Sequence, residues 1–169
     1  MDARAQAVVN SPSYIHPELS FYNPPADSLP FTVTPIPFPA YPLVGANPVV
    51  IIQYVVPNGL LAVINKLSVV HVGGNPPDGT GQVIWRVLKN GAGITGMNNL
   101  TSEFGTYSNP KSLVIVAVEN DILQVTVELP ANLPDGTPNT NMPAGATTAA
   151  SFDGYTYPLS EATLYKAGR

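Results

Sequence analysis

Apolar and polar residues alternate with a period of two along several short segments of this chain, which is the spacing of a β-strand. In 122–129 aliphatic side chains occupy every odd position, and polar side chains occupy 124, 126 and 128. Residues 82–89 are also predicted to form a strand, with Trp85, the only tryptophan of the chain, at its centre. Asn90-Gly91 follows, and both residues tolerate the positive φ that a type I′ hairpin turn requires.

Turn residues, mainly Gly, Pro, Asn and Asp, separate further apolar segments, and no segment has the period of a helix. The predicted strands are 49–56, 60–72, 82–89, 94–97, 112–118, 122–129 and 147–157. We expect 112–118 and 122–129 to pair with each other across the turn between them, and Gly154 to mark a β-bulge. Residues 98–110 and 130–145 are predicted loops. This arrangement predicts an all-β fold, an antiparallel jelly-roll-like β-sandwich.

The predicted core contains residues that share the inward side of their strands. They are Trp85, Val87, Leu123, Val125, Val127, Leu67 and Val69. The same alternation places His71 on one side of 60–72 together with Leu61, Val63, Leu67 and Val69.

Residues 1–48 differ from the rest of the chain because they hold ten of its 19 prolines. Proline fixes φ and lacks an N–H group, so these residues are predicted to form an extended, polyproline-like N-terminal arm. Residues 49–169 then form the β-sandwich domain. The arm has many apolar side chains and few charges, and we expect its aromatic rings to anchor it on neighbouring subunits. The predicted anchors are Tyr14, Phe21, Tyr22, Phe31, Phe38 and Tyr41.

The chain carries little charge for its length. Charged residues make up 11% of the 169 residues, whereas about 25% is usual for a soluble domain. The net charge of −4 provides no basic surface for nucleic acid. No apolar run approaches the ~20 residues of a transmembrane helix, and the first residues lack the apolar run of a signal peptide. We expect neither nucleic acid nor a membrane as a partner. The absence of cysteine excludes disulfides and thiolate metal sites.

Two motifs raise the question of a bound ligand. Residues 91–96, GAGITG, match the G-x-G-x-x-G pattern of dinucleotide-binding sites. That site also needs a following helix whose N-terminus holds the pyrophosphate, and the polar residues 97–102 have no helical period. We interpret the motif as a hairpin turn. The loops 75–78 and 135–141 contain oxygen ligands suited to calcium, but their spacing fits no EF-hand and is ordinary for turns.

The remaining candidates for chemistry are isolated residues. His16 and His71 lie in separate regions, and neither is accompanied by residues that would form a catalytic or zinc site. We expect no catalytic residues, no metal and no cofactor. Tyr107, Tyr155 and Tyr157 are candidate ligand-facing residues because exposed aromatic rings stack on sugars; the favoured alternative is that they pack on a sheet or at an interface.

Several short motifs, in order along 49–157, resemble small jelly-roll virion proteins of tailed bacteriophages. The matching segments are 56–61 (VPNGLL), 64–69 (INKLSV), 85–91 (WRVLKNG), 118–121 (VEND) and Gly154-Tyr155. Such domains more often have Gly-Asp where this chain has Asn120-Asp121, although Asn suits a turn as well. The resemblance implies a capsid decoration (cement) protein, a head-fibre base, or a tail or baseplate module, with no catalytic residues.

From the resemblance and the arm together we expect a non-enzymatic cement protein, a homotrimer that binds the major capsid protein. The arm is not basic, which places the protein on the outer capsid surface, away from the genome, after assembly in the host cytoplasm. A receptor- or carbohydrate-binding module of a phage tail, head fibre or baseplate is the alternative. An enzyme would need clustered histidines and carboxylates, which the predicted strands do not supply.

Overall fold

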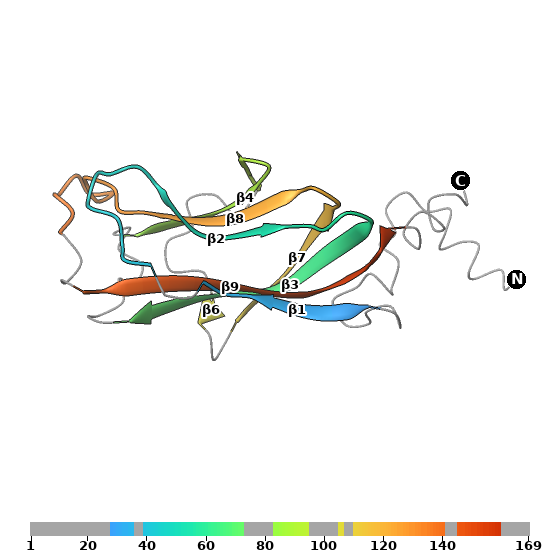
Figure 1. The fold of residues 1–169 in the computed structure, drawn as a ribbon. Helices are drawn as coiled ribbons and strands as arrows, with labels where there is room; N and C mark the ends of the chain where they lie inside the picture. Colours follow the sequence, from blue (N-terminus) through green and yellow to red (C-terminus); the bar gives the residue numbers. More distant parts are fainter. Residues whose placement is uncertain are drawn as a thin grey trace, which may run out of the picture.

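The structure, a computed structural model, consists of two β-sheets packed face to face (Figure 1). It describes residues 28–35, 39–72, 83–94, 105–106, 110–140 and 145–159. The strands in these ranges are β1 (Leu29–Val33), β2 (Val49–Val55), β3 (Leu60–Val72), β4 (Ile84–Lys89), β5 (Ala92–Gly93), β6 (Gly105–Thr106), β7 (Lys111–Val118), β8 (Ile122–Glu128) and β9 (Thr147–Pro158).

The strands pair in a nested order that defines the topology. One sheet, called the β3 sheet below, has the order β1-β9-β3, and both β7 and β6 pair with the far side of β3. The other, the β8 sheet, has the order β2-β8-β4-β5. The first strand therefore pairs with the last, β2 with β8, β3 with β7 and β4 with β5. This is a jelly roll, so the predicted fold class is confirmed.

The core between the sheets follows from the alternation seen in the sequence. Inward side chains of β8 meet Trp85 and Val87 of β4, which pair with Val127 and Val125. Of the seven predicted core residues, six are buried, and Val69 is partly buried against the same cluster. Asn90 and Gly91 have φ values of 53° and 78°, which confirms the hairpin turn at the start of the G-x-G-x-x-G motif. The returning strand is Ala92–Gly93, earlier than the predicted 94–97.

The prediction that 112–118 and 122–129 pair with each other is wrong. β7 pairs with β3 in one sheet, whereas β8 pairs with β2 and β4 in the other. The residues Glu119 and Asn120 carry the chain from one sheet to the other, and Asn120 has a φ of 66°. A short turn signal indicates a change of direction, but it does not by itself distinguish a hairpin from a connection between sheets.

The bulge lies in β3 and not at Gly154. Ile64 pairs with Gly154 and Lys66 with Asp153, so Asn65 is the extra residue of β3. This shift sends Leu61 and Val63 to the outer face of the sheet, while Leu67 and Val69 point into the core. The single side predicted for those four residues is therefore incorrect. Gly154 lies opposite the bulge, where a Cβ atom would be 2.1 Å from the Val63 carbonyl oxygen.

Gly154→Ala is therefore expected to destabilise the protein. The added methyl would meet backbone atoms of β3, which can move only if the pairing around the bulge shifts. Overpacking of this kind costs about 1–3 kcal/mol. Thermal unfolding checks the prediction, and Gly59→Ala is a control for positive φ alone, since the space around Gly59 is open. A Gly154→Ala protein that melts like the wild type would show that β3 does not approach Gly154 this closely.

The sandwich extends further toward the N-terminus than the predicted boundary at residue 48. β1 lies within the predicted arm, yet it pairs with β9 over its whole length. The Thr148 N–H donates to the Pro39 carbonyl at 2.9 Å, and the Gly45 N–H donates to the Leu129 carbonyl at 2.7 Å. Residues 28–35 and 39–48 therefore belong to the folded domain, because β1 pairs with β9 and the backbone of 39–48 bonds to the rest of the sandwich at these points.

Candidate functional site

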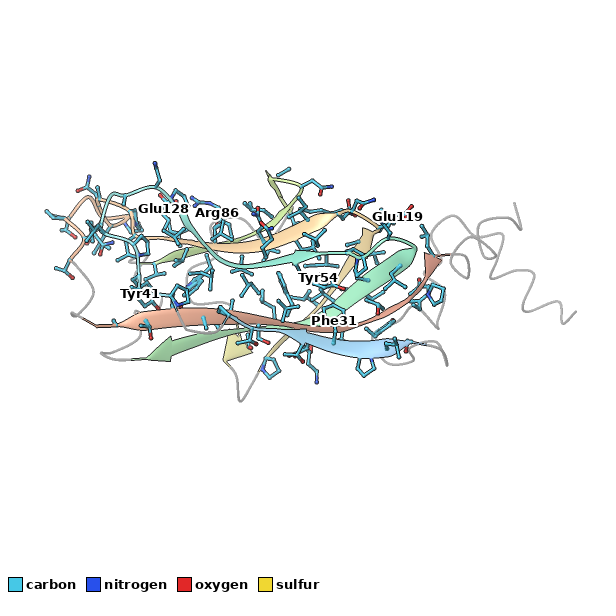
Figure 2. The ribbon with its side chains drawn as sticks, in the orientation of Figure 1. Phe31, Tyr41, Tyr54, Arg86, Glu119 and Glu128 are labelled. Atoms are coloured by element: carbon cyan, nitrogen blue, oxygen red, sulfur yellow. The ribbon has the colours of Figure 1, made fainter. Side chains whose placement is uncertain are left out.

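Two of the predicted arm anchors pack within the chain's own sandwich. The Phe31 ring stacks on Tyr54 of β2 with a centroid distance of 4.7 Å (Figure 2). The Tyr41 ring meets Trp85 edge to face at 6.3 Å. Burial raises the pKa of Tyr41, and a hydrogen bond with Thr148 partly offsets that rise. Phe31 and Tyr41 therefore pack against side chains of their own domain. This corrects the expectation that they lie on neighbouring subunits. The anchors Tyr14, Phe21, Tyr22 and Phe38 lie outside the described residues.

The candidate ligand-facing tyrosines of β9 are buried. Tyr155 and Tyr157 form a small apolar cluster with Leu61 and Val63 of β3 on the outer side of the β3 sheet. Burial raises the pKa of Tyr155. Neither ring is open to a sugar, so both are removed from the set of candidate ligand-facing residues. Tyr107 lies outside the described residues.

A group of hydrogen-bonded polar side chains lies where three turns meet at one end of the sandwich. We call residues 56–59, 89–91 and 119–121 the turn cluster; Glu119 marks this end in Figure 2. Asn120 N–H donates to the Val56 carbonyl at 2.9 Å, and Val56 N–H donates to the Asp121 carbonyl at 3.0 Å. The Gly59 N–H donates to Glu119 Oε2 at 2.7 Å. The cluster therefore ties the β2–β3 turn to the β7–β8 turn.

Asp121 is the centre of the turn cluster. Its carboxylate accepts hydrogen bonds from Asn90 Nδ2 at 2.7 Å and from the Val118 N–H at 2.8 Å. Lys89 Nζ lies 2.7 Å from Asp121 Oδ2 and donates to the Val116 carbonyl at 3.2 Å. Burial raises the pKa of Asp121, but the hydrogen bonds from Lys89, Asn90 and Val118 and the charge of Lys89 outweigh this, so the pKa lies below its usual value.

The turn cluster joins the two sheets. Lys89 ends β4 of the β8 sheet, and its ammonium reaches β7 of the β3 sheet. Asn90 Oδ1 also accepts the Ile122 N–H at 2.8 Å. Each of these polar atoms is engaged in a bond between turns, which is the chemistry of a structural clamp.

The remaining candidates for ion binding were the acidic loops and the histidines. In the 135–141 loop, Asp135 Oδ1 accepts the Thr137 N–H at 2.9 Å and the Thr137 hydroxyl at 2.6 Å, which is ordinary turn chemistry. These bonds lower the pKa of Asp135. Across the ranges that the structure describes, no group of three or more His, Asp or Glu side chains is arranged to hold a metal. The loop 75–78 and His16 lie outside these ranges, and the side chain of His71 is not described.

Among the exposed apolar side chains of the described residues, a row on β7 was not predicted from the sequence. Val114, Val116 and Val118 of β7 point away from the core, with exposed fractions of 46%, 41% and 39%. The opposite side chains of the same strand, Ile115 and Ala117, are buried. We call the three valines the β7 stripe. The sequence does contain a signal for the β7 stripe. The run 113–118, LVIVAV, is apolar at every position, and a strand that is apolar on both faces is usually covered on both faces.

No protein-family model matches the chain, and no curated protein sequence matches it. In the part of the chain that the structure describes, no helix is long and apolar enough to span a membrane.

Proposed function

We propose that this protein is a non-enzymatic structural protein of a virus particle, a decoration protein on the outer surface of a bacteriophage capsid. The observation that carries the proposal is the jelly-roll sandwich with an exposed apolar β7 stripe. A strand that is apolar on both sides fits a protein that buries surface against neighbours. The motifs that resemble phage virion proteins lie on this same sandwich.

The proposed partners are the major capsid protein and further copies of this chain, assembled in the host cytoplasm. Because Phe31 and Tyr41 pack inside the domain, the proposed clamp is confined to residues 1–27, with Tyr14, Phe21 and Tyr22 as its aromatic anchors. Apolar anchors dominate the affinity of such contacts. Their binding depends little on salt, since no cluster of charges drives it.

The carbohydrate-binding alternative is weaker than the sequence indicated. It depended on exposed aromatic rings, and two of the three candidates are buried beneath the outer surface of the β3 sheet. We therefore do not propose it as a second function.

Deletion of residues 1–27 tests the proposal. The shortened chain is expected to keep the wild-type melting temperature, because β1 and the contacts of 39–48 remain. It should no longer co-sediment with capsids that lack the protein, whereas the full chain should do so even at high salt. Replacing Tyr14, Phe21 and Tyr22 with alanine is the matched point variant.

Deletion of residues 1–48 is the contrasting variant. It removes β1 and both the Phe31–Tyr54 and Tyr41–Trp85 contacts, so its loss of binding would reflect loss of the fold. Full-length protein that does not co-sediment with capsids would refute the decoration role. If the chain without 1–27 binds as tightly as the full chain, the clamp lies elsewhere.

A further inference from the structure

The turn cluster contains both Asn-Gly pairs of the chain, Asn58-Gly59 and Asn90-Gly91, and all four residues are exposed to water. An Asn-Gly pair is prone to spontaneous deamidation, because glycine has no Cβ atom to shield its backbone nitrogen. That nitrogen attacks the side-chain Cγ of the asparagine, and the side-chain amide takes the proton of the nitrogen and leaves as ammonia. Water then opens the cyclic succinimide to aspartate or isoaspartate. Each pair is therefore a site at which the chain can be modified without an enzyme.

The geometry of this attack is demanding. The nitrogen and the Cγ atom must come within about 3–3.5 Å of each other in the correct alignment. The asparagine side chain has to rotate toward its own backbone, and the peptide that follows it has to turn its nitrogen toward the side chain. A hydrogen bond that holds either the side chain or that peptide in another orientation therefore slows the reaction, because the bond must break first.

At the Asn90-Gly91 pair the side chain of the asparagine is held. Asn90 Nδ2 donates to Asp121 Oδ1 at 2.7 Å, and Asn90 Oδ1 accepts the Ile122 N–H at 2.8 Å. The Asn90 N–H also donates to the Ile122 carbonyl at 2.8 Å. Both ends of the amide are thus bonded to the β7–β8 turn and the start of β8. The Cγ atom between them cannot rotate toward the nitrogen of Gly91 while these bonds are intact.

At the Asn58-Gly59 pair the backbone is held instead. The Gly59 N–H, which contains the attacking nitrogen, donates to Glu119 Oε2 at 2.7 Å. The Gly59 carbonyl accepts the Leu159 N–H at 2.7 Å. Turning the peptide between Asn58 and Gly59 toward the asparagine side chain would break the bond to Glu119, which is a strong one because its acceptor is charged.

We propose that Asn58 and Asn90 are latent deamidation sites and that Glu119 and Asp121 protect them. Glu119 holds the attacking nitrogen of the first pair, whereas Asp121 holds the leaving amide of the second. The two carboxylates of the turn cluster thus preserve the chemical integrity of the chain in addition to tying its turns together. The proposal does not depend on the capsid role, since it concerns the purified chain alone.

Deamidation would destroy the contacts that prevent it. At Asn90 the product places a carboxylate oxygen where Nδ2 donates to Asp121, so a hydrogen bond becomes a contact between two like charges. At Asn58 an isoaspartate would lengthen the main chain of the β2–β3 turn by one methylene group and displace the Gly59 N–H from Glu119. Loss of either asparagine therefore also loosens the turn cluster.

The test is the rate of deamidation at each site of the full-length protein in mildly alkaline buffer, measured by mass spectrometry of its peptides. In the wild type both sites are expected to react at least about tenfold more slowly than in the same chain unfolded in urea. Glu119→Ala should raise the rate at Asn58 about tenfold and leave Asn90 unchanged, and Asp121→Ala should do the reverse. Each variant is the matched control for the other. Glu119→Gln keeps an acceptor oxygen and should restore most of the protection of Asn58.

Three results would overturn the proposal. They are a folded wild type that deamidates as fast as the unfolded chain, a Glu119→Ala protein with an unchanged rate at Asn58, and variants that accelerate both sites equally, which would indicate a general loosening of the fold. Circular dichroism melting shows whether each variant is folded. If Asp121→Ala does not fold, the two Glu119 variants decide the outcome, because Glu119 is exposed at the end of the sandwich (Figure 2).

Discussion

Trp85→Ala is expected to lower the free energy of unfolding by about 3–5 kcal/mol, the usual cost of removing a large buried aromatic side chain. Trp85 is the second residue of β4, is buried between the sheets, pairs with Val127 of β8 and meets the Tyr41 ring edge to face. Its removal leaves a cavity between the sheets and also removes the ring that Tyr41 contacts. Denaturant unfolding monitored by circular dichroism measures the loss.

Arg86→Ala is the matched control for the tryptophan substitution. Arg86 is the next residue of β4, but it points to the outer face and pairs with Glu128 across the sheet surface (Figure 2). A half-exposed ion pair of this kind contributes at most about 1 kcal/mol. If Trp85→Ala is no more destabilising than Arg86→Ala, Trp85 does not lie in the core and the packing of the sandwich is different.

Asp121→Asn is expected to destabilise the protein by about 2–3 kcal/mol, although the side chain keeps its shape. The carboxylate accepts from Asn90 Nδ2 and the Val118 N–H and neutralises Lys89. An amide presents an N–H group to at least one of these donors and carries no charge. Asp135→Asn is the control, because the hydrogen bonds of Asp135 lie within its own loop. This substitution should lower the melting temperature much less than Asp121→Asn does.

The pH dependence of protein stability provides a second measurement of how much Asp121 contributes to the free energy of unfolding. Its pKa is lower in the folded protein than its ordinary value, so the unfolded chain takes up a proton first as the pH falls. The contribution of Asp121 is therefore fully present above about pH 4, the unfolded pKa, and is lost as the pH falls toward the folded pKa. Asp121→Asn should show a smaller loss of stability in acid, and an unchanged acid profile would contradict the clamp.

The sequence predicted the strands well because alternation along a strand is local. The segments 60–72, 122–129 and 147–157 agree with β3, β8 and β9 to within a residue at either end. The main failures concern pairing, because the partner of a strand can lie far away in sequence or in the other sheet. The extra residue Asn65 reverses the sides of β3 beyond it, and no residue type at that position signals a bulge.

The candidate site was harder to predict than the fold for the same reason. The proline-rich composition of 1–48 predicted an arm over the whole segment, and it did not show that β1 would pair with β9. Asp121 and Lys89 are 32 residues apart along the numbering, and only the meeting of three turns brings them together. The β7 stripe was visible as a continuous apolar run, but its meaning depended on β7 lying outside the β8 sheet.

The nested pairing of the jelly roll also constrains the order of events during synthesis. Of the strands that the structure describes, β1 is synthesised first and its partner β9 last. β3, the central strand of the same sheet, pairs with β9 along its whole length from Leu60 to Val72. It therefore also lacks this partner until β9 has been synthesised. Contacts of such long sequence separation slow folding, since loop closure precedes the gain from pairing. The β3 sheet therefore cannot be completed until residue 158 has been translated, and the apolar β3 lacks its β9 partner throughout that interval.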